Sequence, residues 1–99
     1  MSRSDAVTIL NKAEKLIKRG WLRGAPKSEL DGNVSYCLGG ALLESCGFYA
    51  TGVMEHDGHL AFDAVDAVLE GDSIPHFNDK IARNVKDVLK VLDKARSTI

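Results

Sequence analysis

The side chains that could bind a metal ion or act as nucleophiles in this chain are few. Two cysteines and three histidines supply the sulfur and imidazole groups: Cys37, Cys46, His56, His59 and His76. A zinc site needs three or four such ligands converging at about 2.0–2.3 Å, and its sequence normally contains closely spaced ligand pairs. No Cys-x-x-Cys pair is present. The spacing therefore predicts no metal site.

Cys37 is a candidate nucleophile, because it stands near the start of an apolar helix and a histidine could act as its base. The sequence contains no glycine-rich phosphate loop, nucleophile elbow or paired-carboxylate arrangement. A chain of 99 residues also rarely encloses a catalytic cleft alone. We therefore expect no catalytic residue and no cofactor, with Cys37 as a small core side chain.

Positive and negative charges are separated along the chain. Residues 1–30 hold seven Lys or Arg against three Asp or Glu, a net charge of +4. Residues 31–72 hold eight acids and no Lys or Arg, a net charge of −8, and residues 73–99 hold six bases against three acids, a net charge of +3. Such a division steers a charged partner, or it is neutralised when the ends pack beside the middle.

Hydrophobic periodicity predicts four helices. They are an amphipathic helix over 4–21, a short buried helix over 36–46 whose glycines let a neighbour approach, an acidic helix over 59–70, and a last helix over 84–95 capped by Asn84. Residues 23–35 are expected to form a loop with a hairpin-like turn at Asp31-Gly32, residues 48–58 a loop, and residues 76–79 a turn. The fold class is therefore predicted to be all-α, a single domain over residues 1–99 in an orthogonal or bundle-like arrangement.

Trp21 and the segment Phe77-Asn78-Asp79 are expected to stabilise the fold. Trp21 is expected to pack against the second helix, with its indole N–H donating to a loop carbonyl. Phe77 is expected to fill the end of the core, while Asn78 and Asp79 hydrogen-bond to nearby backbone.

Several of these residues occur together in one family. Gly20-Trp21, Cys37-Leu38-Gly39-Gly40-Ala41-Leu42 and Phe77-Asn78-Asp79 are similar to the G-W, C-L-x-G-A-L and W-N-D motifs of short uncharacterised proteins from actinobacteria and their phages, known only as a domain of unknown function. Phe77 replaces the Trp of that family, and Asn84 replaces its capping Thr. The resemblance spans residues 16–95, apart from residues 48–58. It implies a fold and a phage or actinobacterial setting, and it implies no activity.

The sequence predicts a cytoplasmic protein that does not contact a membrane. Its first residues lack the apolar segment of a signal peptide, and its apolar runs are far shorter than the ~20 residues that span a bilayer. Two cysteines are also too few for a small secreted disulfide scaffold.

The function expected from these observations is that of a small adaptor or regulator, phage-encoded, which binds a host protein and catalyses no reaction. A homodimer is the other association that its surface allows. The helical core does not explain the apolar residues within 48–59, so this stretch is the predicted contact. Its partner-binding residues are predicted to be Phe48, Tyr49, Val53 and Met54.

The alternative is a nucleic-acid-binding regulator that uses basic faces of the first and last helices. The residues of that face would be Lys12, Lys15, Arg19, Lys86, Lys90 and Lys94. The acidic middle of the chain repels phosphate, and a pI near 6.3 is low for such a protein. Nucleic acid is therefore the less favoured partner.

Overall fold

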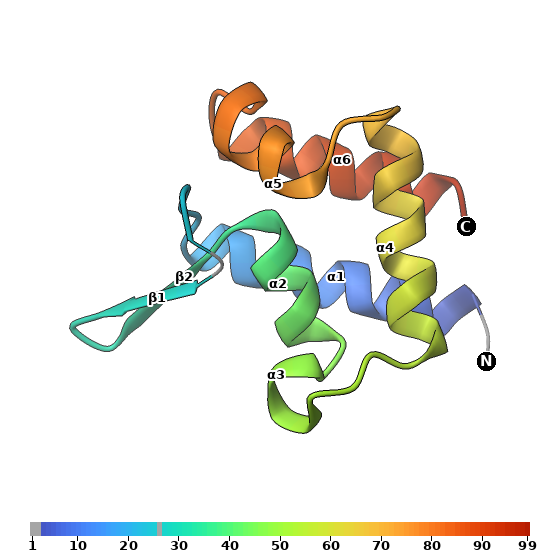
Figure 1. Cartoon of the computed structure of the whole chain (residues 1–99), viewed down its shortest axis with the longest axis horizontal. Coiled ribbons are helices and arrows are strands. Elements are labelled where there is room, and N and C mark those ends of the chain that lie inside the picture. The colour runs from blue at the N-terminus through green and yellow to red at the C-terminus, as the bar shows by residue number, and fades with distance from the viewer. Residues whose placement is uncertain (1–2, 26) are drawn as a thin grey trace.

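The computed structural model describes residues 3–25 and 27–99, which form six α-helices, one π-helical turn and a two-stranded hairpin. The helices are α1 (Arg3–Arg19), α2 (Leu38–Ser45), α3 (Phe48–Thr51), α4 (His56–Leu69), α5 (Ile74–His76) and α6 (Val85–Ser97). Strands β1 (Lys27–Leu30) and β2 (Asn33–Tyr36) make the hairpin, and the π-helical turn η1 (Phe77–Ile81) joins α5 to the segment before α6. The hairpin projects from one end of the helical body, as Figure 1 shows.

Helix α1 lies at the centre of the core, in contact with α2, α4 and α6. Ala6, Leu10, Ala13 and Ile17 recur every three or four residues and are all buried, so one stripe of the helix faces its neighbours. The predicted amphipathic first helix is thereby confirmed. The largest fully buried side chains that the other helices contribute are Leu38, Leu42, Val65, Val88 and Leu92.

The start of α6 follows from its capping residues. The Asn84 side chain accepts a hydrogen bond from the Asp87 backbone N–H at 3.2 Å, which confirms the predicted cap. The Asp87 carboxylate in turn accepts from the Arg83 N–H at 2.9 Å. Side chains thus satisfy backbone donors at this end of the helix.

The prediction of an all-α domain with four helices is wrong first at residues 27–36, where two paired strands replace the expected loop. The predicted hairpin-like turn at Asp31-Gly32 is confirmed. Asp31 and Gly32, at the tip, have φ angles of 52° and 80°, and two positive φ values are what a tight type I′ turn requires. All four residues of β1 are exposed. Because backbone hydrogen bonds to β2 hold this strand and no face of it is buried, its sequence lacks the alternation of apolar and polar residues that predicts a strand.

The second difference lies in residues 48–58, predicted as a loop, which contain α3 and the first residues of α4. Gly47 and Gly52 bound α3 with φ angles of 83° and 74°, the left-handed conformation that ends helices. Gly58 instead lies inside α4 and is buried. A Cβ atom there would lie 2.8 Å from Met54 Cγ and 3.2 Å from Cys46 Cβ, so this glycine allows close packing and does not break the helix.

Residues 74–81 are helical where a turn was expected at 76–79. Ser73 caps α5 by accepting a hydrogen bond from the His76 N–H at 3.2 Å, and α5 continues directly into η1. Phe77 is only 8% exposed and belongs to the core cluster, which confirms its predicted role.

Candidate functional site

The motifs of the family resemblance meet at the side chain of Asn78, which is fully buried. Its Oδ1 accepts hydrogen bonds from Trp21 Nε1 at 2.7 Å and from the Leu38 N–H at 3.0 Å. Its Nδ2 donates to the Leu22 carbonyl at 3.0 Å and to Asp79 Oδ1 at 2.9 Å. The prediction that the indole donates to a loop carbonyl is therefore wrong. Because a buried amide is costly unless it is hydrogen-bonded, this network stabilises the junction between the segment after α1, the start of α2 and η1.

Asp79 and Arg23 extend the network toward the surface. Asp79 Oδ1 accepts a hydrogen bond from the Gly24 N–H at 3.0 Å, and this bond lowers the pKa of Asp79 below its ordinary value. The Arg23 guanidinium lies 5.1 Å from the centre of the Trp21 ring and donates to the Ala82 carbonyl. The side chains of Trp21, Asn78 and Asp79 thus bond to one another and to the backbone, so their role is structural.

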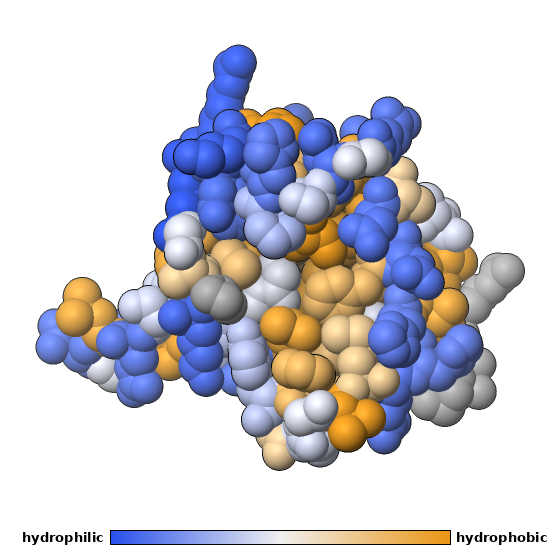
Figure 2. Space-filling model, in the orientation of Figure 1, coloured by the Kyte–Doolittle hydropathy of each residue, from blue (hydrophilic) through white to orange (hydrophobic). Residues whose placement is uncertain are grey.

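An open apolar surface lies between α2, α4 and α5. A surface groove of about 370 Å³ is lined there chiefly by apolar atoms, with Asp66 at its edge. Figure 2 shows apolar surface in the middle of this face, with hydrophilic surface on both sides. The residues that form its walls include Cys37, Gly39, Leu43, Phe62 and Ile74. We call this feature the α2–α4 groove.

Gly39 keeps the α2–α4 groove open. A Cβ atom at this position would lie 3.5 Å from Ile74 Cγ2 and 3.9 Å from Cys37 Sγ, both ordinary van der Waals distances. The prediction that the glycines of this helix admit a close neighbour therefore does not hold at Gly39. Sequence analysis missed the groove. The one feature of the sequence that pointed to it is Gly39, a glycine inside a helix.

Cys37 caps α2, where its Sγ accepts a hydrogen bond from the Gly40 N–H at 3.2 Å. Cys46 Sγ contacts the Leu43 carbonyl at 3.3 Å. Both thiols are free and half-buried. Among the described residues no hydrogen bond joins Cys37 to a histidine, and no group of three or more His, Cys, Asp or Glu side chains is placed to hold a metal ion.

The four predicted partner-binding residues divide into two pairs. Tyr49 is 40% exposed and Val53 is 60% exposed, so both can meet a partner. Phe48 and Met54 are half-buried. Phe48 packs edge-to-face on Tyr49 with 6.3 Å between ring centres, and Met54 lies against Gly58.

Lys27 connects the hairpin to this part of the molecule. Its Nζ lies 5.4 Å from the centre of the Tyr49 ring and 5.9 Å from that of Tyr36, and it forms an ion pair with Glu44 at 3.6 Å. The hydroxyl of Tyr36 donates to Glu44 at 3.0 Å. One face of the Tyr49 ring is thus engaged within the chain, which orients the ring.

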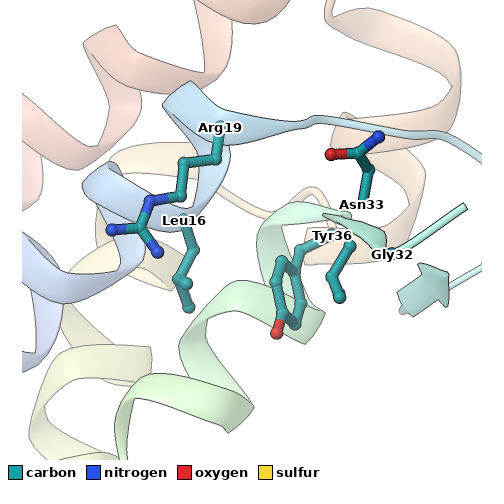
Figure 3. A pocket seen from close by; sticks show the side chains of 6 residues that line it. Leu16, Arg19, Gly32, Asn33 and Tyr36 are labelled. Carbon is teal, nitrogen blue, oxygen red and sulfur yellow. The ribbon is translucent and has the colours of Figure 1, made fainter.

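The predicted basic residues of α1 lie together. Lys12, Lys15 and Arg19 line a groove of about 290 Å³ beside α2. A second hollow, of about 430 Å³, adjoins it between α1 and the hairpin, where Figure 3 shows Leu16 and Tyr36 with Arg19 and Asn33 on either side. Glu44 also lines the first groove, so its positive charge is partly balanced.

The basic residues of α6 do not line this groove. Lys86, Lys90 and Lys94 are exposed, and Lys94 lines a hollow that α6 forms with α4. Arg96 bonds across the seam between α1 and α6 to Asn11 and Glu14, at 2.9 Å each, and within α6 to Asp93. Two carboxylates therefore stand at this seam, between the helices that carry the two basic sets.

These features define a small, mostly helical domain with a hairpin, a buried asparagine that joins three segments, and an open apolar groove. Residues 1–98 match the model of a family of unknown function, DUF6197, and the chain belongs to that family. No curated protein and no solved structure matches the chain. No helix among the described residues is long and apolar enough to cross a membrane.

Proposed function

We propose that this protein is a small non-enzymatic adaptor or regulator that binds another protein. The observation that carries the proposal is the α2–α4 groove, together with the exposed Tyr49 and Val53 on the neighbouring segment. Apolar hollows and partly exposed aromatic side chains are typical of the centres of protein interfaces.

The resemblance to actinobacterial and phage proteins supports the biological setting of this proposal. A phage-encoded adaptor would act in the cytoplasm on a host protein. A homodimer is the other association that the same surface would serve.

The alternative proposal is a nucleic-acid-binding regulator, and one observation favours it. Lys12, Lys15 and Arg19 line a single groove that could contact phosphates. The carboxylates of Glu14 and Asp93 at the seam between α1 and α6 weaken a basic face shared by the two helices.

Affinity capture from an actinobacterial lysate, with and without nuclease, distinguishes the two functions. A host protein retained at stoichiometric yield after nuclease treatment is the expected result. The double variant Tyr49→Ala, Val53→Ala should reduce its capture at least tenfold, because central interface side chains often contribute more than about 1.4 kcal/mol each.

Leu30→Ala serves as the matched control, because Leu30 is 74% exposed at the tip of the hairpin. Both proteins should melt within a few degrees of wild type, since exposed side chains contribute little to stability. Retention that disappears with nuclease would favour the alternative. Undiminished capture by the double variant would place the contact elsewhere.

A further inference from the structure

We propose that the α2–α4 groove receives an aliphatic side chain from a basic amphipathic segment of the partner. This inference rests on the proposed function, because it names the chemistry of the protein that is bound. Three observations carry it: the shape of the groove, the glycine in its wall and the charge around it.

The shape of the groove suits a side chain presented by another protein. The hollow of about 370 Å³ is a surface groove with an apolar lining from three helices, and its size is at the low end of ligand pockets, which run from about 300 to 1,000 Å³. Ile74 and Phe62 supply side walls, and Leu43 extends the apolar surface along α2. An aliphatic side chain placed here would exchange water for apolar contacts on several sides.

Gly39 is the second observation. Alanine is a better helix residue than glycine, and its methyl group would fit between Ile74 and Cys37 without displacement. Packing within the chain therefore does not require glycine at this position. Because Gly39 has no side chain, the groove has room there for a side chain of a partner protein.

Charge is the third observation, and it determines the partner. The helices on both sides of the groove belong to residues 31–72, which contain eight acids and no Lys or Arg. Asp66 lines the groove and takes part in none of the ion pairs found in the described part of the chain. Glu70, the residue that follows α4, is also exposed. Lys or Arg residues beside the inserted side chain would meet these carboxylates.

The competing occupant is a second copy of this chain. Ile81 is 43% exposed and stands between the exposed Lys80 and Arg83, so the chain itself carries a short basic segment with an aliphatic side chain. That segment has one apolar residue in a turn and no apolar stripe. A separate amphipathic segment therefore matches the apolar lining of the groove and the carboxylate of Asp66 better.

The test uses the thiols of the full chain as reporters. Cys37 lines the groove, whereas Cys46 is a half-buried thiol that does not. Iodoacetamide labelling of each, read by peptide mass spectrometry, is measured with a synthetic amphipathic helix that has a leucine stripe and lysines elsewhere. A peptide with glutamates in place of the lysines is the control. The lysine peptide should slow labelling of Cys37 at least fivefold and leave Cys46 unchanged.

Matched variants distinguish binding in the groove from attraction of the lysine peptide to the acidic surface as a whole. Asp66→Asn should weaken binding of the lysine peptide about two- to fivefold, the usual effect of one exposed charge. Asp63→Asn removes the same charge from the same helix at a residue that lines a different hollow, and it should have less effect. Gly39→Leu should fill the groove and abolish protection of Cys37, and circular dichroism verifies that this variant remains folded.

Three results would overturn the inference. The first is absence of protection by the lysine peptide. The second is equal protection by the two peptides, which would remove the charge argument. The third is labelling of Cys37 that slows as the protein itself becomes more concentrated, because a second copy would then fill the groove. Capture of a host protein through Tyr49 and Val53 could still succeed in each case, so the proposed function is tested separately.

Discussion

Replacing Asn78 with alanine should lower the free energy of unfolding by about 2–6 kcal/mol. Asn78 is fully buried and makes four hydrogen bonds. The buried Leu38 N–H would lose its partner, which costs about 1–3 kcal/mol. Trp21 and Leu22 are only half-buried, so water can replace part of their lost bonds and each contributes about 0.5–1.5 kcal/mol. Domains of this length have a total stability of about 5–15 kcal/mol, so the loss is a large fraction.

Urea unfolding followed by tryptophan fluorescence measures this loss directly, because Trp21 is the single tryptophan and bonds to Asn78. The unfolding midpoint should fall while the slope m stays constant. Asn33→Ala is the matched control: Asn33 is exposed, and its replacement should change stability by no more than about 0.5 kcal/mol. A loss below about 1 kcal/mol in Asn78→Ala would refute the structural role assigned to this network.

Two further predictions concern stability alone. Gly39→Ala should leave the melting temperature unchanged or raise it by a few degrees. Gly58→Ala should lower the melting temperature, because its Cβ would lie within 3.2 Å of two side-chain atoms. Thermal unfolding of both variants measures these changes, and a destabilised Gly39→Ala protein would contradict the prediction. The hydrogen bond from Arg96 lowers the pKa of Glu14 in the folded state, so the stability from this pair is present above about pH 4.5, the ordinary pKa, and is lost as the pH falls through the lowered value. Wild type should therefore exceed Glu14→Gln in urea midpoint at about pH 6, and the gap should shrink at about pH 3; a gap that does not change with pH would show that the pair is not coupled to folding.

The elements that sequence analysis located correctly are those with a local signal. The 3.6-residue stripe of α1 and the side-chain cap at Asn84 depend on neighbours within a few residues. Residues 48–58 lacked such a signal, because a glycine can end a helix or lie within one. Gly47 and Gly52 end helices through left-handed φ angles, whereas Gly58 lies inside α4 because Cys46 packs against it.

The candidate site was predictable only in part. The stretch containing Tyr49 and Val53 was identified because its apolar residues fit no helical stripe, and the structure leaves these two side chains exposed. The α2–α4 groove was missed, because its walls come from three separate helices, α2, α4 and α5, that only the packing of the chain brings together. Periodicity shows that a helix has an apolar face, and it does not show whether another element covers that face.

The sequence by itself determined the positions of the long helices and the separation of charge along the chain, because each depends on residue type and local spacing. Only the tertiary structure decided that Asn78 bonds to Trp21 and Leu38 inside the fold. It also decided that Lys12, Lys15 and Arg19 line one groove, and that an ion pair between Arg96 and Glu14 joins α1 to α6. These outcomes depend on contacts between segments distant in sequence, which form only when the helices pack around α1.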